Sequence, residues 1–367
     1  MPPATFRTII IARPSPPPAP AAWPRWTPKN FWRLTPAESF ALQPDAIVSV
    51  EPSILEIDAE LQLMLRAILL NLSESRRLAR FVMHNPTSRR VVRRFVAGET
   101  LDDAVAAVRA INQAGCPASF DYLGESVSTE AEARRAADAY RSILDRIAAE
   151  RLDANASLKL TQLGLDAYPA LCESLLAEIV AHAERLNNFV RIDMESSAYT
   201  QRTLDLCKRV HAKHASVGTV VQSYLFRTEQ DAKDLIAAGI RMRLVKGAYK
   251  EPSAVAYPKK SDADANFIRV MKLLLSSDQY HAIATHDPNM QEATKRFAAE
   301  QGIAKDKFEF QMLYGIRTDL QAQLTRERYR LRVYVPYGSD WFPYFMRRLA
   351  ERPANLKFFL SNLFRRS

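Results

Sequence analysis

Eight short apolar runs, each separated from the next by a longer amphipathic stretch, organise the chain beyond about residue 116. The longer stretches repeat apolar residues at a spacing near 3.6, which predicts helices. Strands joined by helices are parallel, and eight of them is the number in a (β/α)8 TIM-type barrel. We interpret the runs as nearly all apolar, which is typical of strands buried on both faces. The runs are PASFDYL (117–123), ASLKLTQLGL (156–165), FVRIDM (189–194), GTVVQSYL (218–225), RMRLVKGA (241–248), HAIATHD (281–287), FEFQML (308–313) and RLRVYVPYG (330–338).

An open doubly wound sheet is the alternative α/β architecture. Such sheets usually carry a glycine-rich phosphate loop after the first strand. This chain has only ten glycines, with no GxG and no GxxxxGK[ST]. The pattern therefore favours the barrel over residues 111–367, and any dinucleotide must be held without that loop.

The chain before the barrel divides into two parts. Residues 51–110 show helical spacing, with Thr100 as an N-cap and acidic residues in the following turn. Residues 1–50 include RPSPPPAPAAWPRWTP, whose prolines exclude a helix or a central strand. We expect 1–50 to be a disordered extension, or an over-long gene start, and 51–110 to be N-terminal helices.

Charge and composition exclude several classes of function. The net charge of +10 suits an anionic partner, but no nucleic-acid-binding motif accompanies it, so we expect no nucleic acid. Three cysteines without a CxxC indicate a reducing, cytoplasmic setting. His211 and His214 lie on a lysine-rich amphipathic stretch without other ligand types nearby, so we expect no metal. No run reaches the ~20 apolar residues that span a bilayer.

Polar side chains recur where the predicted strands end. Active sites of barrels are built at the C-terminal strand ends, so these side chains should converge on one rim. Buried amides such as Gln222 and Gln311 should be hydrogen-bonded. Among the side chains that we expect to point inward, the cations Lys159, Arg243, Lys246, Arg347 and Arg348 outnumber the acids Asp193 and Glu195, which favours an anionic ligand. With no activated nucleophile, the hard chemistry should belong to a cofactor. The residues of this rim are Asp121, Glu125, Lys159, Gln162, Asp193, Met194, Glu195, Gln222, Arg243, Lys246, Thr285, His286, Asp287, Gln311 and Tyr334.

Arg347 and Arg348 are adjacent on the last predicted helix, 338–352. Neighbouring helical residues lie about 100° apart, so both cannot face open water, and one must lie at the edge of the buried side. Two adjacent guanidinium groups suit a shared carboxylate.

Several of these residues also have purely structural interpretations. Asp193 could cap the helix that follows it. Tyr334 and Met194 could be core filling, and His286 a hydrogen-bonded core histidine. Lys246 before Gly247 could be turn chemistry.

Seven motifs that occur in order resemble bacterial monofunctional proline dehydrogenase, and the resemblance runs from about Phe95 to Phe364. They are LKLTQLGL, RIDME, GTVVQSYLFR, RLVKGAYKEP, ATHDPNM, FEFQMLYGIR and VYVPYGSDWFPYFMRRLAER. The resemblance implies a distorted (β/α)8 barrel that binds FAD without a Rossmann domain. It also implies oxidation of L-proline to Δ1-pyrroline-5-carboxylate, with the electrons passed to a quinone.

The resemblance also implies residue roles. Asp193 and Arg243 are the catalytic pair, with Arg243 beside the flavin and Asp193 orienting Lys159 and Tyr334. Glu125 pairs with Arg347 as a gate over the substrate. The substrate-binding residues implied are Lys159, Tyr249, Leu313, Tyr334, Arg347 and Arg348. The FAD contacts implied are Met194, Gln222, Arg243, Lys246, Gly247, Ala248, Thr285 and His286.

The resemblance includes no aldehyde dehydrogenase domain, so the product is expected to pass to a separate pyrroline-5-carboxylate dehydrogenase. The basic, aromatic tail NLKFFLSNLFRRS (355–367) suits either a peripheral contact with the inner face of the membrane or a packed terminal helix. Two other functions stay open. One is a flavin barrel resembling methylenetetrahydrofolate reductase, and the other is a non-enzymatic basic barrel.

Overall fold

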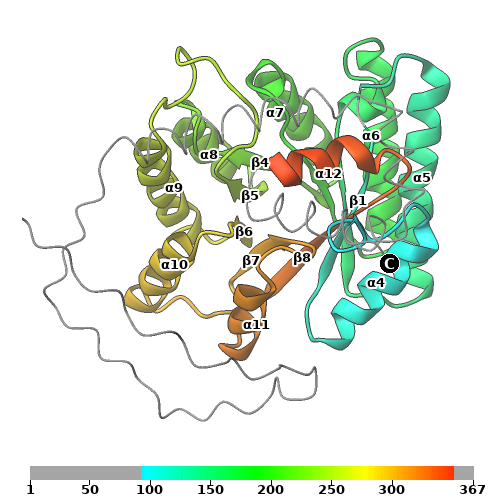
Figure 1. Cartoon of the computed structure of the whole chain (residues 1–367). Coiled ribbons are helices and arrows are strands. Elements are labelled where there is room, and N and C mark those ends of the chain that lie inside the picture. The colour runs from blue at the N-terminus through cyan, green and yellow to red at the C-terminus, as the bar shows by residue number, and fades with distance from the viewer. Residues whose placement is uncertain (1–91, 125, 351–367) are drawn as a thin grey trace, which may run out of the picture. The chain divides into compact units, whose positions relative to one another are not determined.

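The computed structural model describes residues 92–124 and 126–350, and Figure 1 shows their arrangement. Eight parallel strands form a closed barrel in sequence order, with β1 pairing with both β2 and β8. The predicted (β/α)8 barrel is therefore confirmed. The predictions for residues 1–50, most of 51–110 and the tail 355–367 lie outside the described residues. The strands are β1 Ala118–Tyr122, β2 Ala154–Leu158, β3 Val190–Ile192, β4 Val217–Gln222, β5 Arg241–Val245, β6 His281–Ala284, β7 Phe308–Leu313 and β8 Leu331–Tyr337.

Helices follow each strand and surround the barrel (Figure 1). The first described helix begins at the predicted cap, where Thr100 Oγ1 accepts from Asp103 N at 3.1 Å and Asp103 accepts from Thr100 N at 3.3 Å. This reciprocal capping box satisfies two backbone donors of the first turn. The helices are α4 Leu101–Gln113, α5 Glu130–Ala149, α6 Pro169–Arg185, α7 Ser197–His211, α8 Thr228–Ala237, α9 Lys260–Leu275, α10 Pro288–Glu300, α11 Thr318–Arg326 and α12 Trp341–Ala350.

The second apolar run is only partly a strand. β2 ends at Leu158, and a 3₁₀ turn over Thr161–Leu163 follows, closed by Gly164 at φ 86°. Leu160 and Leu163 are fully buried there. A short apolar run indicates that its residues are buried but not which backbone conformation they adopt. The sequence pattern therefore did not distinguish a buried strand from a buried turn.

The interior of the barrel is polar, which corrects our interpretation of the strands as nearly all apolar. Arg243 on β5 reaches Ser157 on β2 at 2.9 Å, and Asp193, directly after β3, accepts from Tyr334 on β8 at 2.6 Å. These pairs lie on strands that are not neighbours, so their side chains meet across the barrel axis. Most TIM barrels fill this space with branched aliphatic side chains.

Helix α12 departs from the regular arrangement, as the expected distortion implied. Its residues Trp341, Phe342 and Phe345 share a buried cluster with Leu123, which follows β1, and with Ile316, beyond β7. The helix therefore covers the C-terminal ends of strands, and Figure 1 shows it running across the barrel. It brings its side chains to the rim where barrel active sites lie.

The chain just before α4 packs against the same helix. Val92, Phe95 and Val96 belong to the α12 cluster. At Gly315, φ is 68° and an added Cβ would lie 1.7 Å from the carbonyl oxygen of Arg94. Only glycine permits this close approach of two backbones.

Candidate active site

Asp193 lies at the centre of the polar interior. Its Oδ1 accepts from Arg243 Nη1 at 2.6 Å and its Oδ2 accepts from the Tyr334 hydroxyl at 2.6 Å. Burial and the neighbouring Asp121 and Asp193 carboxylates raise the pKa of Tyr334, so the phenol stays protonated and donates. The N-cap of α7 is Ser196, so the interpretation of Asp193 as a helix cap is wrong. Its expected contact with Tyr334 is present.

Arg243 is held on three sides. Besides Asp193, its Nη2 donates to Ser157 Oγ at 2.9 Å and its Nε donates to Gln311 Oε1. The guanidinium lies 5.1 Å from the centre of the Tyr334 ring. The side chain is almost fully buried, and three partners on different strands fix its position.

Lys159, directly after β2, forms an ion pair with Asp121, the second buried acid of the site after Asp193. Its Nζ donates to Asp121 Oδ1 at 3.2 Å. Asp121 is buried, and this burial raises its pKa, while the Lys159 cation acts in the opposite direction. Asp121 appeared in the sequence only as a strand-end acid without a role, and the structure makes it part of the site.

The predicted cofactor contacts follow β3 to β6, on one side of the barrel. Gln222 Nε2 donates to the Glu195 carbonyl at 2.9 Å, which confirms that this buried amide is hydrogen-bonded. The neighbouring Met194 is buried. Thr285 Oγ1 accepts from Asp287 N at 3.1 Å, and His286 Nε2 accepts from Leu313 N at 2.9 Å.

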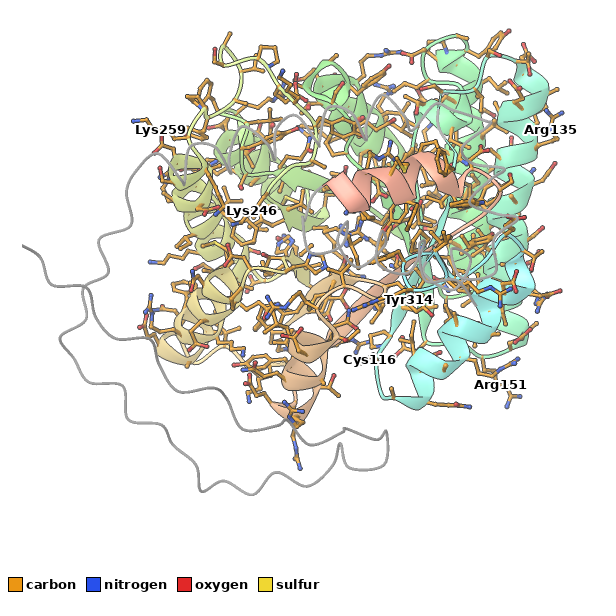
Figure 2. All side chains as sticks on the ribbon, in the orientation of Figure 1. Cys116, Arg135, Arg151, Lys246, Lys259 and Tyr314 are labelled. Atoms are coloured by element: carbon orange, nitrogen blue, oxygen red, sulfur yellow. The ribbon has the colours of Figure 1, made fainter. Side chains whose placement is uncertain are left out.

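Lys246 lies on the same side, between two carboxylates. Its Nζ is 2.6 Å from Asp264 Oδ1 and 2.7 Å from Asp287 Oδ2. Figure 2 shows Lys246 well inside the molecular outline, whereas Lys259, at the far end of the β5–α9 loop, lies at its edge. Lys246 is therefore more than a turn residue, and it tethers this loop to α9 and to the start of α10.

Gly247 opens the β5–α9 loop. Its φ is 119°, and an added Cβ would lie 2.4 Å from the Tyr224 ring. The glycine lets the loop turn close beneath that ring. Ala248 and Tyr249 follow it and are exposed, with Tyr249 at 37%.

Arg347 and Arg348 are half-buried, on a helix whose Phe345 is fully buried. The prediction that at least one arginine lies at the edge of the buried side is confirmed. The Arg348 guanidinium lies 5.2 Å from the centre of the Tyr344 ring, and Leu313 packs against the α12 cluster.

Three further observations concern the gate, metal ligands and membrane-spanning helices. Glu125 lies outside the described residues, so the proposed gate with Arg347 stays a prediction. Over 92–124 and 126–350, no group of three or more His, Cys, Asp or Glu is arranged to hold a metal ion. No helix in those same ranges is long and apolar enough to cross a membrane.

A model of the proline dehydrogenase family matches residues 104–360. Proline dehydrogenase 1 of Bacillus subtilis subsp. natto is 44% identical over 303 residues, covering 83% of this chain and 100% of that protein. The chain belongs to the proline dehydrogenase family. It is therefore an oxidoreductase of proline catabolism with a flavin cofactor. Proline dehydrogenase of Deinococcus radiodurans is 40% identical over 277 residues, covering 74% of this chain and 89% of that protein.

Solved structures agree on the fold. Proline utilization A (PutA) from Bdellovibrio bacteriovorus, inactivated by N-propargylglycine, matches with a TM-score of 0.71 at 23% identity. The match covers 81% of this chain and 38% of that one. At this identity the match supports the barrel fold and nothing further.

The residues present fit a flavin. The adjacent strands β4 and β5 carry the donors Gln222, at the end of β4, and Arg243, in the middle of β5, and β6 is followed by Thr285. Within the described ranges Arg243 forms one ion pair, with Asp193, and a cation fixed at this position could stabilise negative charge on a flavin ring. Gly247, two residues after β5, lies so close to the Tyr224 ring that a side chain there would collide with it.

Proposed function

We propose that the protein oxidises L-proline to Δ1-pyrroline-5-carboxylate with FAD as its cofactor. The observation that carries the proposal is the buried contact between Asp193 and Arg243, which joins two halves of the rim. On one side lie Lys159 and Tyr334, with the arginines of α12 on the helix above. On the other side lie Gln222 on β4, Arg243 on β5 and Thr285, directly after β6.

Arg347 and Arg348 would bind the substrate carboxylate. A guanidinium pairs with a carboxylate in a planar fork that lysine cannot match. Leu313 lies beside α12 and supplies apolar surface for the carbon ring. Fixing both ends of a small substrate is what gives a proper orientation for hydride transfer.

Arg243 would stabilise the negative charge that arrives with the hydride. Bound FAD supplies the hydride acceptor, and a fixed buried cation beside it needs no reorganisation during the reaction. Both oxygens of Asp193 accept hydrogen bonds, from Arg243 and Tyr334. Its role is therefore to hold these two groups in place, and we do not assign it as a base.

The electrons would pass to a quinone, and the product to a separate pyrroline-5-carboxylate dehydrogenase. A quinone dissolves in the membrane, so we place the protein in the cytoplasm, with a peripheral contact at the inner face of the membrane. The reduced flavin must pass its electrons to an acceptor before the next turnover. A contact with the membrane would shorten the time that the reduced enzyme needs to meet a quinone.

The proposal is tested by purifying the protein and recording its visible spectrum. We expect the yellow absorption of oxidised flavin, and its loss under anaerobic conditions on adding L-proline but not NADH. Bleaching by NADH alone would favour a barrel like methylenetetrahydrofolate reductase. A colourless protein that takes up no FAD would favour the non-enzymatic alternative.

A further inference from the structure

We propose that Gln311 and Glu309 on β7 are positioning residues that set the orientation and effective charge of Arg243. The inference rests on the proposed function, since Arg243 matters here as the cation beside the flavin. Neither residue has a role in the mechanism above. Both lie inside the barrel, beneath the rim, and both are buried.

Glu309 is the ionised anchor of the pair. Its Oε1 accepts from Arg332 Nε at 2.8 Å and also from Gln311 Nε2, and its Oε2 accepts from the Tyr280 hydroxyl at 3.0 Å. Arg332 in turn donates to the Ala118 carbonyl at 2.8 Å. Although burial opposes it, Arg332 and the other donors lower the pKa of Glu309, so the carboxylate stays charged.

This charge determines how the Gln311 amide lies. A carboxylate only accepts hydrogen bonds, so the amide must turn its NH2 group toward Glu309. Its carbonyl oxygen then faces the opposite way, where it accepts from Arg243 Nε. A neutral group at position 309 could donate as well as accept, and the amide orientation would no longer be fixed.

The arrangement gives Arg243 one charged and two neutral hydrogen-bond acceptors. A guanidinium has five N–H groups, and three of those in Arg243 donate to Gln311, Asp193 and Ser157. Asp193 alone of these acceptors carries a charge. The amide thus fixes the guanidinium without adding a second negative charge beside it.

The competing interpretation is purely structural, with Glu309 and Arg332 as an ion pair that stabilises the barrel interior. Such a pair would affect thermal stability but not the electron affinity of the flavin. The flavin midpoint potential therefore separates the two interpretations, because a second carboxylate beside Arg243 would oppose the arrival of negative charge.

The test compares Gln311→Glu with Gln279→Glu, which adds the same charge on the α9–β6 turn, where Gln279 donates to the Ile236 carbonyl. We expect Gln311→Glu to lower the equilibrium constant for two-electron flavin reduction at least tenfold, which is about 30 mV. We expect kcat to fall more than the KM for proline rises. Gln279→Glu should leave the potential unchanged.

Gln311→Met and Glu309→Gln keep the inference testable if Gln311→Glu loads no flavin. Both should change the potential or broaden the flavin spectrum, because the amide carbonyl is removed or released. Unchanged potentials in all folded variants, with only the melting temperature lowered, would overturn the inference. Failure of the proposed function is distinguishable, since wild-type protein would then not be bleached by proline at all.

Discussion

Asp193 and Arg243 are 50 residues apart in the sequence, yet their side chains meet at 2.6 Å inside the barrel. Strand β4 separates the two strands that carry them, so the contact is made through the interior and not along a shared ladder. Almost all of both side chains is withdrawn from water, so each charge depends on the other.

Asp193→Ala should leave Arg243 buried without a carboxylate and Tyr334 without its acceptor. Removing one partner of a buried ion pair typically costs about 3–5 kcal/mol of unfolding free energy. We expect a clear fall in melting temperature, and a larger loss of turnover than of flavin content. Asp166→Asn is the control, because its carboxylate pairs with Arg202 on the surface at 3.0 Å. A large loss of flavin content, with normal turnover by the fraction of the protein that still carries flavin, would contradict a role for Asp193 in positioning Arg243 and Tyr334 for the reaction.

Arg348→Met should weaken the binding of proline and leave the flavin content unchanged. Methionine keeps the apolar length of the side chain but removes the charge that pairs with a carboxylate. Titrating proline against flavin bleaching measures the effect, which we expect to be at least tenfold in affinity, or about 1.4 kcal/mol. Arg326→Met, on the exposed end of α11, provides the matched control. Equal affinities in the two variants would show that Arg348 does not bind the substrate.

Gly247→Ala should destabilise the protein more than Gly302→Ala. Both glycines have positive φ, 119° and 65°, and so both variants carry backbone strain of roughly 1–2 kcal/mol. Gly302 has no atom within 4 Å of an added Cβ, whereas the Tyr224 ring lies 2.4 Å from that position at Gly247. Thermal unfolding of the two variants, with and without Tyr224→Ala, measures the difference. Equal melting temperatures for the two alanine variants would refute the close approach.

The stability contributed by Glu309 should depend on pH in one direction. Its pKa is lowered in the folded protein, so the contribution is fully present above the ordinary value of 4.5. It is lost as the pH falls through the lower, folded value. The difference in unfolding free energy between the wild type and Glu309→Gln should therefore narrow below about pH 4.5, as denaturant titrations can measure. A difference that stays constant down to the acid transition would mean that the carboxylate is not charged.

All three cysteines should resist alkylation in the native protein. Cys116, Cys172 and Cys207 are buried, and burial raises the pKa of Cys172 and of Cys207 to about 12. The thiolate is the reactive form, so iodoacetamide at pH 8 should label none of them until the chain unfolds. Mass spectrometry counts the labels with and without denaturant. Rapid native labelling at any of the three would contradict the packing described here.

The barrel itself was predictable from the sequence because each strand is short, contains several apolar residues and lies between two amphipathic helices. Thr100 was predictable as an N-cap because the capping box that it forms with Asp103 lies within four consecutive residues. The turn over Thr161–Leu163 was not, because burial and strand formation give the same apolar pattern over short distances.

The polar interior was harder to predict, although its signal is present. FEFQML places Glu309 and Gln311 two residues apart, and β5 likewise alternates Arg241 and Arg243. This period of two puts such residues on one face of a strand, but the sequence does not say which face points inward. The partner of Lys159 was missed because Asp121 lies on the neighbouring strand β1, and which residues of β1 and β2 lie side by side depends on the strand register, which no single strand encodes.

The approach of Arg94 to Gly315 has a practical consequence for anyone who shortens this protein. Val92, Phe95 and Val96 precede the barrel, yet they pack against the buried aromatic side chains of α12. A truncated protein that begins at β1 would lack these three apolar side chains, and part of the aromatic side of α12 would become exposed to water. Arg347 and Arg348 would then no longer be held in position over the barrel, although every strand of the barrel would still be present.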